Sequence, residues 1–320
     1  MHAAAINLRG GVVSPRGTLL RGQSIIEYVL IIAVIGLVIV FAGPGVAGAI
    51  RNQFNLVGNT VSSGTTGGTE DGGASGGGST GTASATVQAA VAKDAKDWTL
   101  DEQKAVAEDI ASKGEASPAY AKAEAAMNAG TKFSMKLTNG KTLEYRIIGI
   151  NHDDLADGSG KAGLTFEAIN NAMGQQRMNA TDTNAGGWEK SELRGRLNSG
   201  DLWALLPSEL QSKAKAVTKM TDNKADGNYG TPSATTDTVF LLSMAEVYRD
   251  IPCGGDQYEF YKSKGVTSSN GSGASSDFGH RTRSVGESDS TSFRSIASNG
   301  YFGVYSVASG VNYVFPAWCF

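Results

Sequence analysis

The sequence predicts an α+β protein in three parts. These are a hydrophobic N-terminal helix, a Gly/Ser linker, and a C-terminal domain of short helices, a small antiparallel sheet and long loops. Three observations predict this class. An apolar run without charges covers residues 28–50. Gly, Ser and Thr dominate residues 58–86, which therefore bury too little apolar surface to fold. Aromatic and aliphatic residues then return from Phe133 to Phe320, at a density typical of a globular core.

The composition excludes one broad class of partner. The 320 residues carry a formal net charge of −3, and only 18% of them are charged, whereas 42 are glycine. A protein that follows a phosphate backbone needs a basic patch, and none is visible here. We therefore expect no nucleic-acid partner and a polar, uncharged surface of the kind that secreted proteins have.

The first residues are typical of a cleaved leader. Residues 1–22 contain three arginines and no acid, and the apolar run that follows is long enough to span a bilayer. The stretch Ala47-Gly48-Ala49 imitates an ordinary signal-peptidase site. We instead place the cut before the apolar run, between Gly22 and Gln23. Glu27 then becomes the fifth residue of the mature chain, at the mouth of the apolar segment.

This arrangement resembles the class III signal of type IV pilins, most closely that of the tight-adherence (Flp/Tad) pilins. The match consists of Gly22 before the cut, Gln23 and Ser24 after it, and Glu27 with Tyr28 at mature positions five and six. The resemblance implies removal of residues 1–22 by a prepilin peptidase. It also implies that residues 23–57 form a helix that waits in the cytoplasmic membrane and then joins other pilin subunits in an extracellular filament at the cell surface.

In that family, Glu27 and Tyr28 belong to the assembly region. A carboxylate at this depth is costly unless it finds a positive partner. The freed N-terminal amine of a neighbouring subunit supplies one, so Glu27 is expected to set the register between helices. The alternative is a plain signal anchor in which Glu27 reaches out to the membrane interface.

The linker at 58–86 leads to a predicted helical spacer at 87–130. Thr99 followed by Glu102 is a capping box that opens a helix through about Ala111. A second helix is expected to start at Ser117-Pro118 and to end before Gly130.

The domain at 131–320 opens with a predicted hairpin. Strands at 133–137 and 143–150 flank Asn139-Gly140, which favours a primed two-residue turn. Short strands are expected at 301–307 and 312–320. Short helices are expected at 165–173, capped by Thr165, and at 191–197, 201–213 with a break at Pro207, and 243–248. Residues 250–292 are rich in Gly, Ser, Asp and Thr, which is typical of a long functional loop.

This domain resembles an uncharacterised extracellular domain. The shared stretches, in order, are Gly149–Asp153, Asp157–Gly160, Gly186–Trp188, Ser191–Arg194, Leu206-Pro207, Leu241–Ser243, Phe293–Ser295, Phe302–Val304 and Pro316-Ala317. The family usually has Trp where this chain has Ser292 and Phe293, which leaves the local pocket in question. The pattern looks like the C-type-lectin-like fold of the formylglycine-generating-enzyme type. That fold also carries the variable proteins of diversity-generating retroelements.

The residue choice near the C-terminus bears on that link. Residues 288–316 contain no Lys, Glu, Gln, Met or Trp, and use residues that arise when the first two bases of an Asn codon are randomised. A Ser- and Tyr-rich tail is the alternative explanation. Tyr, Ser, Gly and Asn also make adaptable binding surfaces. The predicted ligand-binding residues are Ser292, Ser298, Asn299, Tyr301, Tyr305, Ser306, Asn312 and Tyr313.

The chain offers little enzyme chemistry, and we predict no catalytic residues and no cofactor. His152 lies beside two acids without a second ligand at a metal-site spacing, so a structural role is favoured. Asp153, Asp157 and Gly158 resemble a calcium loop only loosely, and a calcium held by carbonyl groups is the alternative. Cys253 and Cys319 are either a disulfide or two buried thiols, and both interpretations stay open.

The sequence therefore predicts a filament-displayed adhesin, a minor or tip pilin whose outer domain binds an extracellular protein or glycan. Two rivals remain. One is a structural filament subunit with a decorating domain, and the other is a surface-anchored enzyme that would depend on His152 or the cysteines.

Overall fold

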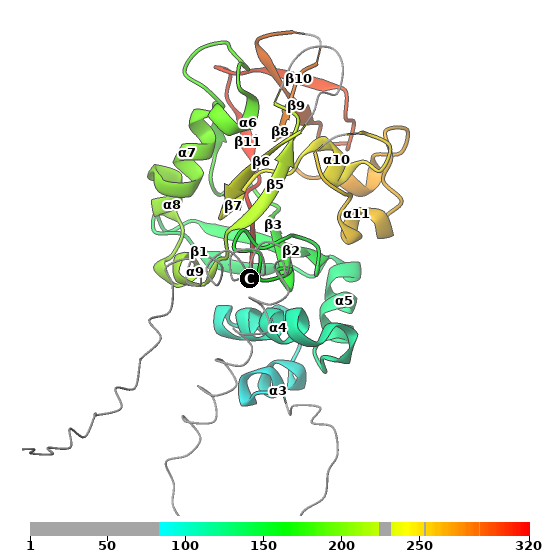
Figure 1. The fold of residues 1–320 in the computed structure, drawn as a ribbon. Coiled ribbons are helices and arrows are strands. Elements are labelled where there is room, and N and C mark those ends of the chain that lie inside the picture. Colours follow the sequence, from blue (N-terminus) through cyan, green and yellow to red (C-terminus); the bar gives the residue numbers. More distant parts are fainter. Residues whose placement is uncertain (1–82, 224–231, 253, 288) are drawn as a thin grey trace, which may run out of the picture. The chain divides into compact units, whose positions relative to one another are not determined.

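The structure is a computed structural model that describes residues 83–320 apart from 224–231, 253 and 288 (Figure 1). Several predictions lie outside these residues: the leader, the cut between Gly22 and Gln23, the assembly residues Glu27 and Tyr28, and nearly all of the linker. Within the described part of the chain, every helix is too short or too polar to cross a membrane.

A five-stranded antiparallel sheet forms one half of the core. Its strand order is β1-β2-β3-β12-β7, so the C-terminal strand is inserted between β3 and β7. Their bounds are Phe133–Lys136 for β1, Thr142–Ile150 for β2, Leu164–Ala168 for β3, Val239–Phe240 for β7 and Ala317–Cys319 for β12. Packed rings of Phe133, Tyr145, Phe166 and Trp318 fill one face of this sheet.

The predicted hairpin is confirmed, but its turn type is not. Phe133 pairs with Tyr145 and Lys136 with Thr142. A primed two-residue turn needs positive φ at both central residues, whereas only Gly140 has one, at 83°. The Leu137 N–H donates to the Lys141 carbonyl (2.9 Å), which makes a three-residue loop with glycine in the left-handed position.

Three N-terminal helices share this core: α3 (Ala85–Ala92), α4 (Leu100–Lys113) and α5 (Tyr120–Ala129). The Thr99–Glu102 capping box and the left-handed Gly130 cap are confirmed. Gln103 of α4 and the hydroxyl of Tyr145 in β2 are hydrogen-bonded (3.0 Å). The helices therefore pack directly against the first sheet.

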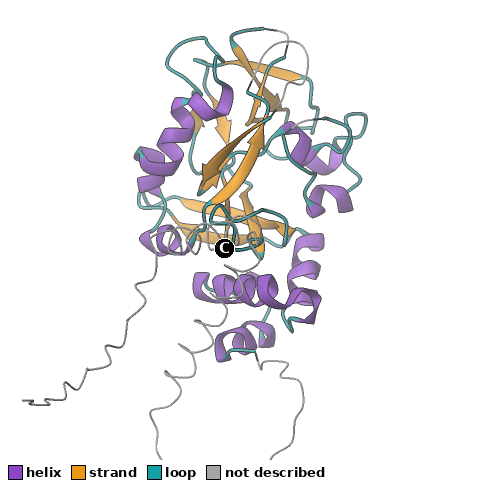
Figure 2. Ribbon diagram, viewed as in Figure 1, coloured by secondary structure: helices purple, strands orange, loops and turns teal. Residues whose placement is uncertain are grey.

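A second five-stranded sheet has the order β10-β9-β8-β11-β4 and mixes directions, because β8 and β11 run parallel. Figure 2 shows its strands at the end of the domain opposite α3. Their bounds are Gln175–Gln176 for β4, His280–Val285 for β8, Ser292–Ile296 for β9, Val304–Val307 for β10 and Asn312–Val314 for β11. The strand β8 lies inside the segment that the sequence predicts to be a long loop.

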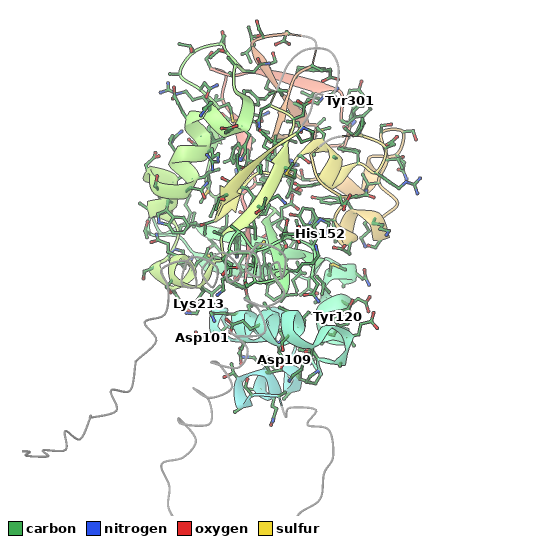
Figure 3. All side chains as sticks on the ribbon, in the orientation of Figure 1. Asp101, Asp109, Tyr120, His152, Lys213 and Tyr301 are labelled. Atoms are coloured by element: carbon green, nitrogen blue, oxygen red, sulfur yellow. The ribbon has the colours of Figure 1, made fainter. Side chains whose placement is uncertain are left out.

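A two-stranded ribbon and several short helices complete the domain (Figure 1). The ribbon is β5 (Val217–Thr221) with β6 (Ser233–Asp237). The helices are α6 (Gly187–Lys190), α7 (Glu192–Ser199), α8 (Asp201–Leu205), α9 (Ser208–Lys213), α10 (Met244–Val247) and α11 (Glu259–Ser263). Lys213 at the end of α9 pairs with Asp101 in α4 (3.0 Å), and both are labelled in Figure 3.

The predicted fold class is wrong. The folded part is a mixed α/β domain with two five-stranded sheets, one of them partly parallel, in place of a small antiparallel sheet. None of the described helices is the long apolar pilin helix that was predicted. The helix predicted to begin at Thr165 is also wrong. Leu164–Ala168 is a fully buried strand held between β2 and β12, and such pairing outweighs local helix signals.

Candidate functional site

Exposed large apolar side chains are concentrated in one short stretch of the chain at and around β10. Among the described residues, five large apolar side chains are exposed, and four of them lie within residues 301–311. We call this surface the β10 face and define it by Ser298, Asn299, Tyr301, Tyr305, Val307 and Val311. Figure 3 labels Tyr301 at the end of the domain where Figure 1 places β9 and β10. Clustered exposed apolar groups are typical of interaction sites, whereas single ones are ordinary.

Strand β10 presents alternate residues to solvent. Tyr305 and Val307 are exposed, while Val304 and Ser306 are half-buried. Among the described strands, β10 pairs only with β9 and so forms an edge of the sheet. Residues 301–313 contain no charged residue and no proline, and those are the devices with which many edge strands discourage association.

A buried tyrosine and a close contact between two loops hold the turn before β10 in place. Tyr248, buried in the core, donates its hydroxyl to the Gly300 carbonyl (2.8 Å). A Cβ on Gly300 would lie 1.9 Å from the carbonyl oxygen of Gly271, so only glycine allows the two loops to touch. The side chain of Asn299 accepts from the Tyr301 N–H (3.0 Å). The turn therefore holds Tyr301 in place without covering its ring.

A charged pair supports the exposed ring of Tyr305. The buried guanidinium of Arg294 pairs with Glu287 and lies 5.0 Å from the Tyr305 ring centre. The Tyr305 hydroxyl donates to the same carboxylate (3.3 Å). Glu287 and Arg294 also line a small pocket whose walls include Met244, Ile251, Pro252 and Val285. This pocket adjoins the β10 face and adds an apolar recess with charged groups at its edge.

Arg281 fixes the segment after β10. Its guanidinium donates to the carbonyls of Ser306, Val307 and Gly310, at 3.3, 3.2 and 2.7 Å. Burial lowers the pKa of Arg281 to about 10, which leaves it charged at neutral pH. The charged guanidinium of Arg281 therefore holds the turn that carries Val311.

The structure separates the predicted contact residues into three groups. Ser298, Asn299, Tyr301 and Tyr305 are exposed. Ser306 and Asn312 are half-buried and share hydrogen bonds with Ser295 on the other side of β10, and half-buried Tyr313 packs on Phe278. Ser292 is 5% exposed, so it lies beneath the surface and outside the β10 face.

Sequence reasoning missed four residues of this region: Val307, Val311, Glu287 and Arg294. The two valines carried a usable signal, because each stands in an uncharged stretch beside a predicted contact residue. The charged pair carried none, since it depends on the antiparallel pairing of Arg294 with Tyr305.

The other candidate groups are engaged in internal contacts. His152 stacks on Tyr258 and its Nδ1 lies 3.1 Å from a Glu259 oxygen. Burial alone would lower the pKa of His152, but the Glu259 hydrogen bond and nearby carboxylates raise it overall. Cys319 is a buried thiol, and Cys253, its partner in the possible bridge, lies outside the described residues, so the pairing stays a prediction.

The loose calcium motif does not gather into a site. Asp153 is buried among hydrogen-bond donors, and Asp157 accepts from the Ser159 N–H (2.9 Å). Nowhere in the described ranges do three His, Cys, Asp or Glu side chains come together as a metal site would require.

Comparison with known proteins gives one match. A family model described as "Domain of unknown function (DUF6273)" matches residues 159–319. The matched stretch contains every strand of the second sheet. No curated protein and no solved structure matches the chain.

Proposed function

Since the chain belongs to the DUF6273 family, whose description assigns no function, we propose from the geometry of its own residues that the domain is a non-catalytic binding module. Its target is an extracellular protein or glycan, and the β10 face is the contact surface. The observation that carries the proposal is the clustering of four exposed large apolar residues within 301–311.

The make-up of the face supports this role. Tyr301 and Tyr305 offer large rings with few rotatable bonds, which lose little entropy on binding, while Ser298 and Asn299 offer adaptable hydrogen bonds. The turn is held by Tyr248 and the segment after β10 by Arg281. A contact surface that is ordered before binding loses less free energy when the partner arrives.

Display of this module at the cell surface rests on the N-terminal sequence. Cleavage between Gly22 and Gln23 and subunit contacts through Glu27 remain predictions. They are independent of the β10 face, because the face is built entirely from residues of the folded domain.

The proposal is tested with the full-length chain on beads, incubated with an immobilised panel of glycans and purified extracellular proteins. We expect a subset of the panel to retain the beads. The double variant Tyr301→Ala/Tyr305→Ala is expected to lose about 2 kcal/mol or more of binding free energy, roughly thirty-fold in Kd.

The matched control is Met220→Ala. Met220 and Tyr305 are each 41% exposed, and Met220 belongs to β5, outside the face. The control should bind as the unmodified chain does, and thermal unfolding should show that all variants are folded. Equal binding by the double variant and the control would refute the assignment of the face.

A further inference from the structure

Four charged side chains meet in the interior, away from the β10 face. Asp153 follows β2, Lys219 belongs to β5, Glu246 to α10 and Arg283 to β8, and each is at most 4% exposed. Burying charges is costly even when they are paired. Packing alone therefore does not explain why four charged side chains are buried together in the core.

The ammonium of Lys219 lies between two carboxylates. Its Nζ is 2.5 Å from an oxygen of Asp153 and 2.5 Å from an oxygen of Glu246. The rings of Phe240 and Tyr258 enclose the same nitrogen at 4.4 and 5.2 Å from their centres. The amine is thus held against two acids inside an apolar enclosure.

The two carboxylates differ in their surroundings. Asp153 accepts from the hydroxyls of Thr165 (2.5 Å) and Tyr258 (3.0 Å), both neutral donors, besides Lys219. Glu246 accepts two guanidinium hydrogen bonds from Arg283 and the Ser243 N–H (2.9 Å). Burial raises the pKa of both carboxyl groups, but Lys219 lowers the pKa of Asp153 and Arg283 lowers that of Glu246, so both acids are ionised. Asp153 differs in that neutral hydroxyls donate to its oxygens.

We propose that Lys219 and Asp153 join in an intramolecular amide bond, with Glu246 as the proton acceptor. The Nζ of Lys219 attacks Cγ of Asp153, a C–N bond forms, one C–O bond of the carboxyl group breaks, and one water leaves. Two protons leave Nζ, one before and one after the attack. Glu246 passes both of them to the departing oxygen, which leaves as water. An ammonium and a carboxylate give an amide and water, so no oxidant, cofactor or other reactant is needed.

The roles follow from contacts at the reacting atoms. The hydroxyls of Thr165 and Tyr258 lie where negative charge develops on the Asp153 oxygens during attack, as in an oxyanion hole. Holding the amine against the acid replaces an encounter in solution.

The ammonium is the resting form of Lys219. Burial lowers the pKa of Lys219, but Asp153 and Glu246 raise it further, so the ammonium is the main form. The neutral amine is the minor form, which suits a bond that forms once in each chain.

Peptide mass spectrometry of the purified full-length chain tests the proposal. Trypsin cuts after Lys and Arg, so a bond at Lys219 blocks that cut and joins residues 147–161 to residues 216–224. We expect this joined species, lighter by one water than the sum of its two peptides, with fragment ions that assign the bond to Asp153.

Three variants sharpen the test. Lys219→Arg and Glu246→Gln are each expected to abolish the joined species. Lys161→Arg is the matched control, because Lys161 and Asp154 form a neighbouring ion pair that is exposed (3.0 Å), and it should keep the species. Separate peptides from the folded, unmodified chain, with cleavage after Lys219, would overturn the proposal, as would fragment ions that place the bond on Glu246. The measurement does not involve the β10 face.

Discussion

Replacing Arg283 by methionine is expected to lower the free energy of unfolding by about 3–5 kcal/mol, the usual range when one partner of a buried ion pair is removed. Arg283 is fully buried and donates both to Glu246 and to the carbonyls of Met220, Leu241 and Gly254. The variant removes a donor from these carbonyl groups and one of the two cations that pair with the Glu246 carboxylate. Chemical denaturation at neutral pH measures the loss.

Arg196→Met is the matched control for this prediction. Arg196 pairs with Asp201 (2.8 Å) at the surface, where the two side chains are 31% and 65% exposed. Exposed pairs contribute less than about 1 kcal/mol. Similar losses in the two variants would show that the buried cluster does not hold the ribbon, α10 and the second sheet together.

Replacing Gly163 by alanine is expected to cost about 1–3 kcal/mol or more, because a new side chain in a full interior forces the backbone to shift. A Cβ on Gly163 would lie 1.8 Å from the carbonyl oxygen of Ala107 in α4. That contact joins α4 to the chain just before β3, so the variant tests whether the N-terminal helices belong to the domain. Thermal unfolding gives the readout.

Gly195→Ala is the matched control, because a side chain at Gly195 has free space around it. Gly195 lies in α7, and a Cβ there meets nothing within 4 Å. Alanine in a helix interior is worth about 0.5–1 kcal/mol over glycine, so this variant is expected to be neutral or more stable. Destabilisation by Gly195→Ala with no effect of Gly163→Ala would contradict the packing described for α4.

Local signals were enough to predict several elements. The Thr99–Glu102 box, the Gly130 cap, the break at Pro207 and the short helices near 191–197 and 243–248 all appear where expected. Each depends on a local interaction or on the backbone preference of one residue: the Thr99 side chain bonds to a nearby backbone N–H, Gly130 adopts a left-handed conformation, and Pro207 interrupts a helix. Such interactions are visible in the sequence because both partners stand next to each other.

Strands β4, β8 and β9 of the second sheet were missed because they are defined by distant partners. Residues 280–285 read His-Arg-Thr-Arg-Ser-Val and look polar, yet β8 is central in the sheet. Arg283 enters the core only because Glu246 meets it there. A buried charge looks like a surface residue in the sequence until its partner, here 37 residues away, is placed beside it.

Only part of the candidate site could be predicted from the sequence. The composition of residues 298–305 pointed to the exposed turn and to Tyr301 and Tyr305. It did not show that Ser292 is buried, because β9 is covered on both faces and has no exposed residue.

Amide hydrogen exchange of the complex with a panel target shows whether the β10 face is the contact surface. We expect the amides in residues 298–312 to exchange more slowly on binding, and those in residues 85–129 to be unchanged. Tight binding that leaves residues 298–312 unaffected and protects amides elsewhere in the domain would contradict the account.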